Sequence, residues 1–233
     1  MCGRYTIRRP GLLAKLVYQE EFEEFSEIRL TSLPPNFGIR PTTSVPIVRF
    51  NQAKRRVLGE ATWGFIPFWS KGKPGRMPIN AVSESVATNG MFRESFKRRR
   101  CLIPADGFYE PKGPKTQKRR QPYFFRRPDD DVFAFAGLWD RWTAPEGEAV
   151  ETCVLLTVGP NELMRPIHDR MPVILRPDAY DRWMDRDVPG EGVAELMKPI
   201  GDEFLETWAV RDMERDPETN RGMRGDGTTY REL

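Results

Sequence analysis

The hydrophobic and polar positions of the chain change period several times, and the stretches of helical period are short. Leu12, Leu13, Leu16 and Val17 recur at helical spacing, and acidic residues follow at positions 20–24. This pattern predicts a first helix in the region. Further short helices are expected at residues 91–97, 178–185 and 191–197.

Strand patterns cover more of the chain than helical ones. Residues 56–65 are expected to form a hairpin with the strand that ends at Val48. Residues 152–158 are nearly all apolar, which indicates a central strand. Further strands are expected at residues 123–126 and 132–139, and in the stretch that carries Glu110 after a turn.

An aromatic stretch at residues 63–69 is interrupted by glycine and proline, so it cannot form a regular helix. Trp63 and Phe65 have the spacing of strand residues that face a core. Phe68 and Trp69 run directly into basic, flexible sequence, and two interpretations of them stay open. They are either buried or form an exposed platform on which nucleic-acid bases stack.

The composition is that of a globular chain. Hydrophobic residues make up 39% of the 233 residues and aromatic residues 11%, which suffices for a core despite 30% charged residues. No linker divides the chain, so residues 2–210 are expected to form one domain, followed by a loosely ordered tail at 211–233. No apolar run reaches the roughly 18 residues of a membrane span, and no secretory signal is recognisable.

The cysteines argue for a reducing compartment and against a metal site. They are Cys2, Cys101 and Cys153, and the chain has neither a Cys-x-x-Cys motif nor a Cys/His cluster. Cys101 and Cys153 lie in apolar surroundings and are expected to be buried. A glycine-rich phosphate loop is also absent from the sequence. We therefore expect no metal, no cofactor and a cytoplasmic location.

The charge is concentrated in one part of the sequence. The formal net charge is only +3, but residues 93–127 contain twelve basic and three acidic residues, a net +9 that leaves −6 for the rest. Such a concentration is typical of proteins that bind a polyanion such as nucleic acid. The alternative is a pair of solvated basic loops, and both interpretations stay open.

Cys2 directly follows Met1. Removal of Met1, expected before a residue as small as cysteine, would place a free α-amine and a thiol on one residue. Such a 1,2-aminothiol condenses with an aldehyde to a five-membered thiazolidine, and covalent geometry supplies the proximity. The α-amine titrates near pH ~8, well below a lysine at ~10.4, so it is usable near neutral pH. The alternative is an inert cysteine at the chain end.

Glu110 and His168 are candidates for proton transfer. Glu110 follows aromatic residues in an expected strand, where burial tends to raise the pKa of a carboxyl group. The alternative is a glutamate paired with an arginine. His168 is the only histidine in the chain and lies in a polar triplet between apolar segments. It is either structural or an acid–base group that works near neutrality.

Five motifs occur together, and the combination is specific although each alone is weak. In chain order they are Met1 followed by Cys2-Gly3-Arg4-Tyr5; Trp63-Gly64 with Pro67 and Trp69; Asn80-Ala81 with Glu84; Ala105-Asp106-Gly107-Phe108-Tyr109-Glu110; and Ile167-His168-Asp169-Arg170-Met171-Pro172. Over residues 2–210 the set resembles the SOS response-associated peptidase (SRAP) domain, whose members shield abasic sites in single-stranded DNA. The resemblance implies one α+β domain, a mostly antiparallel, barrel-like β-sheet flanked by helices, with the active site beside a basic DNA channel.

The resemblance also implies roles for individual residues. Cys2 would form the thiazolidine with the ring-opened sugar aldehyde, and Asn80 would orient the adduct. Glu110 would move protons during ring opening and support strand cleavage by β-elimination, and His168 would act as its acid–base partner. The DNA-binding candidates are Arg4, Phe68, Trp69, Lys71, Arg98 and Arg99.

The implied partner is single-stranded DNA that contains abasic sites, which would bring this cytoplasmic protein to the nucleoid. No membrane partner is expected, and the chain is expected to be monomeric. A contact with the replication machinery stays open.

The sequence departs from the commonest family pattern at four positions. Val82 and Gly90 stand where many members have arginine, which would weaken the local grip on phosphates. Gly38 stands where an asparagine is usual, and Pro111 where a tryptophan is frequent.

Two other functions are compatible with these residues. One is a thiol peptidase or autopeptidase in which Cys2 attacks an amide and His168 is the base. The other is a noncatalytic single-strand-binding module.

Overall fold

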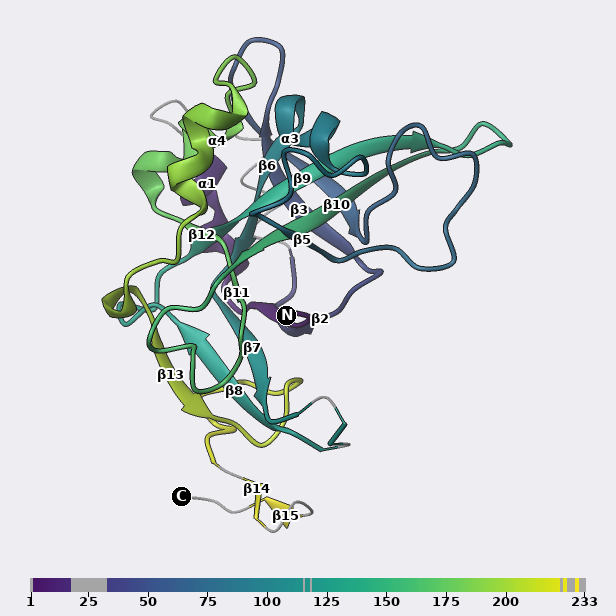
Figure 1. Cartoon of the computed structure of the whole chain (residues 1–233). Helices are drawn as coiled ribbons and strands as arrows, with labels where there is room; N and C mark the ends of the chain where they lie inside the picture. Colours follow the sequence, from purple (N-terminus) through teal and green to yellow (C-terminus); the bar gives the residue numbers. More distant parts are fainter. Residues whose placement is uncertain are drawn as a thin grey trace.

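The strands of the protein form two main sheets, one above the other in Figure 1. The computed structural model describes residues 2–17, 33–114, 116–117 and 119–222, together with the backbone of residues 224–225 and 229–230. The acidic stretch at 20–24 lies outside the described residues. Among those described, no helix is long and apolar enough to cross a membrane.

The upper sheet closes into a five-stranded barrel. Its strands are β3 (Ser44–Phe50), β4 (Arg56–Trp63), β6 (Arg100–Ala105), β9 (Phe133–Thr143) and β10 (Ala149–Val158). The order is β10-β4-β3-β6-β9, and β9 pairs back with β10. The expected hairpin of β3 with β4 is confirmed, and only the β10–β4 contact within this ring is parallel.

β10 is the central strand that its apolar sequence predicts. Besides β4 and β9, it pairs with β5 (Asn80–Val82) in parallel and with β11 (Met171–Pro172) antiparallel. The short strand β12 (Ile174–Leu175) pairs with β9. β10 therefore fixes two segments, β5 and β11, that are far apart in the sequence.

The lower sheet is antiparallel and has the order β13-β8-β7-β1-β2. Its strands are β1 (Tyr5–Ile7), β2 (Asn36–Ile39), β7 (Gly107–Lys112), β8 (Gln121–Arg126) and β13 (Glu206–Ala209). The sequence analysis did not predict β1, β2 and β13. Strands of three or four residues are too short to show a period, and only the neighbouring strands define them. A separate pair, β14 (Arg224–Gly225) and β15 (Thr229–Tyr230), follows near the C-terminus.

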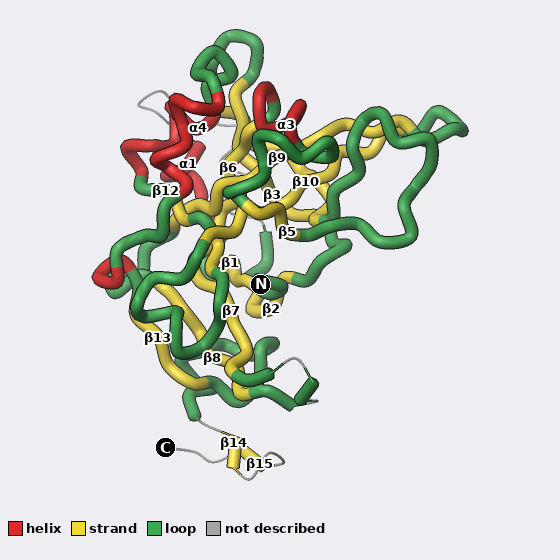
Figure 2. Tube along the Cα trace, in the orientation of Figure 1, coloured by secondary structure: helices red, strands yellow, loops and turns green. Residues whose placement is uncertain are grey.

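Short helical segments flank the strands, as Figure 2 shows. They are η1 (Pro10–Leu13), α1 (Ala14–Val17), α3 (Arg93–Arg98), η2 (Pro177–Ala179), α4 (Tyr180–Met184), η3 (Gly190–Met197) and η4 (Asp202–Phe204), where η marks a 3₁₀ helix. The segment at 191–197 is 3₁₀ rather than α, and two glycines in its first turn lower its α-helical propensity. The predicted class, a mostly antiparallel barrel flanked by helices, is confirmed.

One continuous hydrophobic core fills the barrel and extends to the lower sheet. Trp63, Phe65, Cys101 and Cys153 are all fully buried, as predicted. The ring of Tyr5 packs edge-on against Trp63, with the ring centroids 5.3 Å apart. The chain is therefore anchored in the core only three residues after Cys2.

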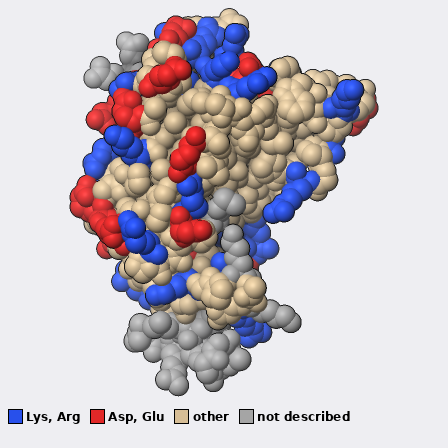
Figure 3. All heavy atoms as spheres, in the orientation of Figure 1, with Lys and Arg blue, Asp and Glu red and all other residues tan. Residues whose placement is uncertain are grey.

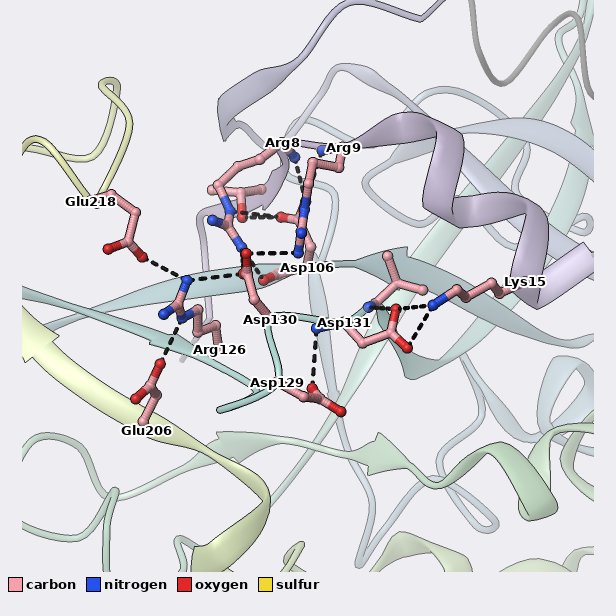
Figure 4. Close-up of polar contacts among 12 residues, drawn as sticks. Arg8, Arg9, Lys15, Asp106, Arg126, Asp129, Asp130, Asp131, Glu206 and Glu218 are labelled. Atoms are coloured by element: carbon pink, nitrogen blue, oxygen red, sulfur yellow. Dashed lines mark hydrogen bonds and ion pairs between the residues drawn. The ribbon is translucent and has the colours of Figure 1, made fainter.

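Asp106 fastens β1 to the β6–β7 junction (Figure 4). Its carboxylate accepts hydrogen bonds from the Thr6 hydroxyl at 2.7 Å and from the backbone N–H groups of Arg8 at 2.6 Å and Arg9 at 3.0 Å. The Arg8 guanidinium pairs with Asp106 and also with Asp130. Asp106 and the Arg8 side chain are both buried. This cluster holds the N-terminal segment in register with β7.

We expect Asp106→Asn to lower the free energy of unfolding by about 3 kcal/mol, because removing one partner leaves the buried charge of Arg8 poorly compensated. Urea denaturation measures the change. The matched control is Asp131→Asn, which removes an exposed ion pair with Lys15 and should cost less than about 1 kcal/mol. Equal losses in the two variants would contradict this role for Asp106.

Residues 211–222, the first part of the tail that was expected to be loosely ordered, lie against the lower sheet. Val210 and Arg221 form a β-bridge, and the Asn220 carbonyl accepts the Arg211 N–H. A Cβ atom at Gly38 would lie 2.4 Å from the Met213 carbonyl oxygen, so glycine at this position permits the close approach. The domain boundary at residue 210 stays a prediction.

Candidate active site

Cys2 lies beside the strand that carries Glu110. β1 pairs with β7 through Tyr5 opposite Phe108, and the Tyr109 N–H donates to the Arg4 carbonyl at 2.9 Å. Residues 2–4 therefore continue along β7 beyond the last formal pair. Cys2 is fully buried, and its Sγ lies 3.8 Å from the Arg4 carbonyl oxygen.

Asn80 reaches Cys2 from the barrel. It begins β5, where Asn80 pairs with Leu155 of β10. Its Nδ2 donates a hydrogen bond of 3.0 Å to the Cys2 carbonyl oxygen. Because β5 is held by the central strand, this amide places the backbone of Cys2 at a fixed position relative to the barrel.

Glu110 is a buried carboxyl group next to Cys2. Burial raises its pKa to about 7. The N-terminal ammonium group and then Arg120 oppose this rise, and the negative charge of Asp169 adds to it. Burial, together with the charge of Glu110, also raises the pKa of the Cys2 thiol. A carboxyl group that titrates near neutrality can both accept and donate a proton. The raised pKa is compatible with the proton-transfer interpretation of Glu110.

His168 lies in the loop before β11, with its side chain largely buried. The Arg170 N–H donates to His168 Nδ1 at 3.0 Å, and Asp169 Oδ1 lies 2.9 Å from the same nitrogen. The negative charge of Asp169, in the same loop, contributes to the raised pKa of Glu110. Asn80 thus contacts Cys2 directly, while Glu110 acts on the Cys2 thiol, and Asp169 on Glu110, through their charges.

These groups supply a thiol, proton-transfer groups and an amide. No group of three or more histidine, cysteine, aspartate or glutamate residues that could hold a metal ion occurs among the described residues. The chemistry that the site can perform is nucleophilic attack by sulfur or by an amine, assisted by proton transfer.

Phe68 and Trp69 are exposed, at 51% and 53%, which supports the platform interpretation over burial. Asp140 is buried and accepts the Phe68 N–H at 3.0 Å, and it pairs with Arg99 at 3.1 Å. The Arg99 guanidinium lies 5.3 Å from the centroid of the Phe68 ring. Arg99 is therefore engaged with Asp140 and Phe68 and holds the platform.

The other DNA-binding candidates lie apart from one another. Arg4, half-buried, pairs with Glu214 at 3.5 Å. Lys71 follows the platform in an exposed loop, and Arg98 is exposed on α3.

The basic stretch at 93–127 does not fold into one patch. In Figure 1, α3 lies at the upper end of the molecule and the β7–β8 connection at the lower end. Arg100 is buried and donates to backbone carbonyls, while Arg126 and Arg127 pair with acidic residues. In Figure 3, basic and acidic side chains are interspersed along the left edge, and basic ones predominate along the right edge. The strands carry the parts of this stretch to different places in the fold. The positive charge is therefore less concentrated on the surface than it is in the sequence.

A cavity of about 1460 Å³ lies between α3, the β3–β4 turn and the segment at 184–191. Neither Cys2, Glu110 nor His168 lines it, so its size alone does not make it the reaction centre. A shallower groove of about 330 Å³ adjoins Asn80 and includes Val82. Asn80 is the residue of the candidate site that lines this groove.

Three polar residues that organise the site received no role from the sequence. Asp106 fixes the N-terminal segment, Asp140 fixes the platform, and Glu84 forms an ion pair with Arg170, both contacts 2.7 Å long. The signal available for Asp140 was a single acid within a largely apolar strand. Glu84 and Arg170 were present in the motifs, but the sequence could not show that they meet.

Comparisons with known proteins agree with this arrangement. The sequence profile described as SOS response associated peptidase (SRAP) matches residues 1–214. The chain is 33% identical over 224 residues to the abasic site processing protein YoqW of Bacillus subtilis (strain 168), covering 94% of this chain and 96% of YoqW. It is 29% identical over 199 residues to the abasic site processing protein YedK of Escherichia coli (strain K12), covering 84% and 85%.

The fold is also found in a solved structure. An X-ray crystal structure of a protein from Bacteroides thetaiotaomicron superposes with a TM-score of 0.77 and 24% identity, covering 91% of this chain and 93% of that one. Together, the matched profile and the similarity to abasic site processing proteins show that the chain belongs to the SOS response associated peptidase family.

Proposed function

We propose that the protein captures abasic sites in single-stranded DNA covalently, through a thiazolidine between Cys2 and the ring-opened sugar aldehyde. The observation that supports the proposal is that Cys2 interacts with two other candidate residues. Asn80 holds the Cys2 carbonyl, and Glu110, with a pKa near 7, interacts electrostatically with the thiol. The names of the relatives as abasic site processing proteins support the same substrate.

The reaction requires a free α-amine on Cys2, and therefore a chain from which Met1 has been removed. The amine adds to the aldehyde carbon, and the resulting carbinolamine loses its hydroxyl group as water to give an imine. The thiol sulfur then adds to the imine carbon, and its proton passes to the nitrogen, which closes the ring. Glu110 and His168 would carry the protons in both steps. The net loss is one water molecule per crosslink.

Recognition of the substrate cannot depend on the edge of a missing base. It requires contacts with the backbone, stacking on neighbouring bases and capture of the aldehyde. Phe68 and Trp69 would stack on the bases, Arg4, Lys71 and Arg98 would contact phosphates, and Cys2 would capture the aldehyde. Arg99 would act through Phe68.

The proposal is tested by incubating the protein with a single-stranded oligonucleotide that contains one abasic site. Intact-mass spectrometry should show the protein without Met1 and a heat-stable adduct whose mass is the sum of the two partners minus one water. The same oligonucleotide after borohydride reduction lacks the aldehyde and should give no adduct. Salt-sensitive binding without any adduct would indicate a noncatalytic binding module, and peptide turnover without an adduct would indicate a thiol peptidase.

Stacking gives a further prediction. Trp69→Ala should weaken binding of undamaged single-stranded DNA by roughly 10- to 100-fold, because stacking on an aromatic side chain contributes about 1–3 kcal/mol per base. Fluorescence anisotropy measures the affinity. Trp69→Phe keeps an aromatic face and should retain most of it. If Trp69→Ala binds as tightly as the wild type, the platform does not contact DNA.

A further inference from the structure

The ion pair between Glu84 and Arg170 joins the two segments that flank β10. Glu84 follows β5, and Arg170 precedes β11. Both carboxylate oxygens lie 2.7 Å from guanidinium nitrogens, and Arg170 also donates to the Thr157 carbonyl at 2.6 Å. The hydrogen bonds from Arg170 lower the pKa of Glu84 to about 2, so the pair stays charged at neutral pH. A bidentate pair of this kind fixes orientation as well as distance.

The pair holds the side chain of Arg170, and the backbone N–H of the same residue meets His168. This N–H donates to His168 Nδ1 at 3.0 Å, while Asp169 Oδ1 lies 2.9 Å from the same atom. The two contacts require opposite states of Nδ1, because an N–H donor needs the nitrogen lone pair and a carboxylate needs a proton on the nitrogen. Asp169 is 86% exposed and well solvated, whereas Arg170 is anchored. The Arg170 N–H therefore influences the protonation state of His168 Nδ1 more strongly than Asp169 does.

We propose that Glu84 and Arg170 are positioning residues for His168. They hold the Arg170 N–H on Nδ1, so the neutral ring carries its proton on Nε2. Asp169 is the competing partner that accepts Nδ1–H when the ring takes the other tautomer or a second proton. His168 thus enters the crosslinking reaction as a proton donor at Nε2, a step that rests on the function proposed above. Neither Glu84 nor Arg170 needs to touch the substrate.

The chain contains one histidine, so its nitrogen resonances can be assigned without ambiguity. A long-range proton–nitrogen correlation spectrum of the DNA-free protein at a pH where the ring is neutral should show an unprotonated Nδ1 and a protonated Nε2. In Glu84→Gln the bidentate pair is lost, and the signals should shift toward a mixture of tautomers. The crosslinking rate should fall roughly 10-fold, a part of the ~10²–10⁴-fold that a positioned acid–base group contributes.

A rescue separates positioning from general damage to the fold. Adding Asp169→Ala to Glu84→Gln removes the competing carboxylate, so the Nε2–H tautomer and most of the rate should return. Glu203→Gln is the matched control. It removes the carboxylate from the surface pair of Arg176 and Glu203, which are 2.9 Å apart, and should change neither the spectrum nor the rate.

The inference is overturned if the wild type carries its proton on Nδ1, or if a folded Glu84→Gln protein keeps the wild-type His168 signals. It is also overturned if the Asp169→Ala addition restores nothing. Failure of the proposed function gives a different result: the wild type forms no adduct with abasic DNA, while Glu84→Gln still shifts the tautomer in the DNA-free protein.

Discussion

Replacing Cys2 by alanine should reduce the heat-stable crosslink with abasic DNA to background. The variant keeps a free α-amine, so it can still form an imine with the sugar aldehyde, but it cannot close the ring. The thiol owes its effect to its attachment next to the amine, because intramolecular groups reach effective concentrations of about 10⁵–10⁸ M when well oriented. Denaturing gel electrophoresis after heating measures the adduct.

Two further variants make this result specific. Cys2→Ser should give an adduct that survives heating only after reduction of the imine, because the hydroxyl is a poorer ring-closing nucleophile than the thiol. Cys153→Ala changes a fully buried cysteine on β10 and should crosslink as the wild type does. A heat-stable adduct of Cys2→Ala at wild-type yield would show that another group is the nucleophile.

Glu110→Gln should lower the crosslinking rate by roughly 10²-fold or more, which is the contribution of a positioned acid–base group. The wild-type rate should also change with pH around the pKa of about 7 that burial gives Glu110. In Glu110→Gln this inflection should disappear. Single-turnover crosslinking across a pH series measures both effects, and an unchanged pH profile would assign the inflection to another group.

The same substitution should have the opposite effect on stability. The unfolded chain releases the Glu110 proton near pH 4.5, whereas the folded protein keeps it up to about pH 7. Between these values the folded state binds more protons, so its stability falls as the pH rises. The difference corresponds to about 3 kcal/mol at about 1.4 kcal/mol for each tenfold change in proton affinity.

We therefore expect Glu110→Gln to be more stable than the wild type at about pH 8 and equal to it below about pH 4.5. Urea denaturation at several pH values measures the difference in the free energy of unfolding. Glu203→Gln, on the surface, should show no such dependence. A wild type whose stability rises with pH relative to Glu110→Gln would contradict the raised pKa.

The sequence predicted the parts of the fold that have a clear period. The hairpin of β3 with β4, the apolar strand β10 and the burial of Trp63 all follow from local pattern, and the structure confirms them. For the site, the motifs identified Cys2, Asn80, Glu110 and His168 as candidates, and in the structure Asn80 donates a hydrogen bond to the Cys2 carbonyl oxygen. Their catalytic roles stay a proposal.

What the sequence could not show depends on contacts between distant residues. Thr6 and Asp106 are 100 positions apart, and Glu84 and Arg170 are 86 apart, so no local pattern reports either contact. Tyr5, Thr6 and Ile7 are all good strand formers, but three residues are too few to define a strand, and β1 is recognisable only through its pairing with β2 and β7. The basic stretch is dispersed for the same reason. Contacts between distant residues decide the fold, and they place segments that are neighbours in the sequence at opposite ends of the molecule.

The position of β1 has a mechanical consequence. A DNA strand bound at Cys2 would transmit any pulling force directly to β1. This strand is paired on both edges, with β2 and β7, and its far end is tied to Asp106. A load along β1 must therefore shear two hydrogen-bonded ladders at once instead of peeling one strand from an edge. If the proposed crosslink forms at Cys2, this pairing would let the N-terminal segment bear tension along the DNA strand.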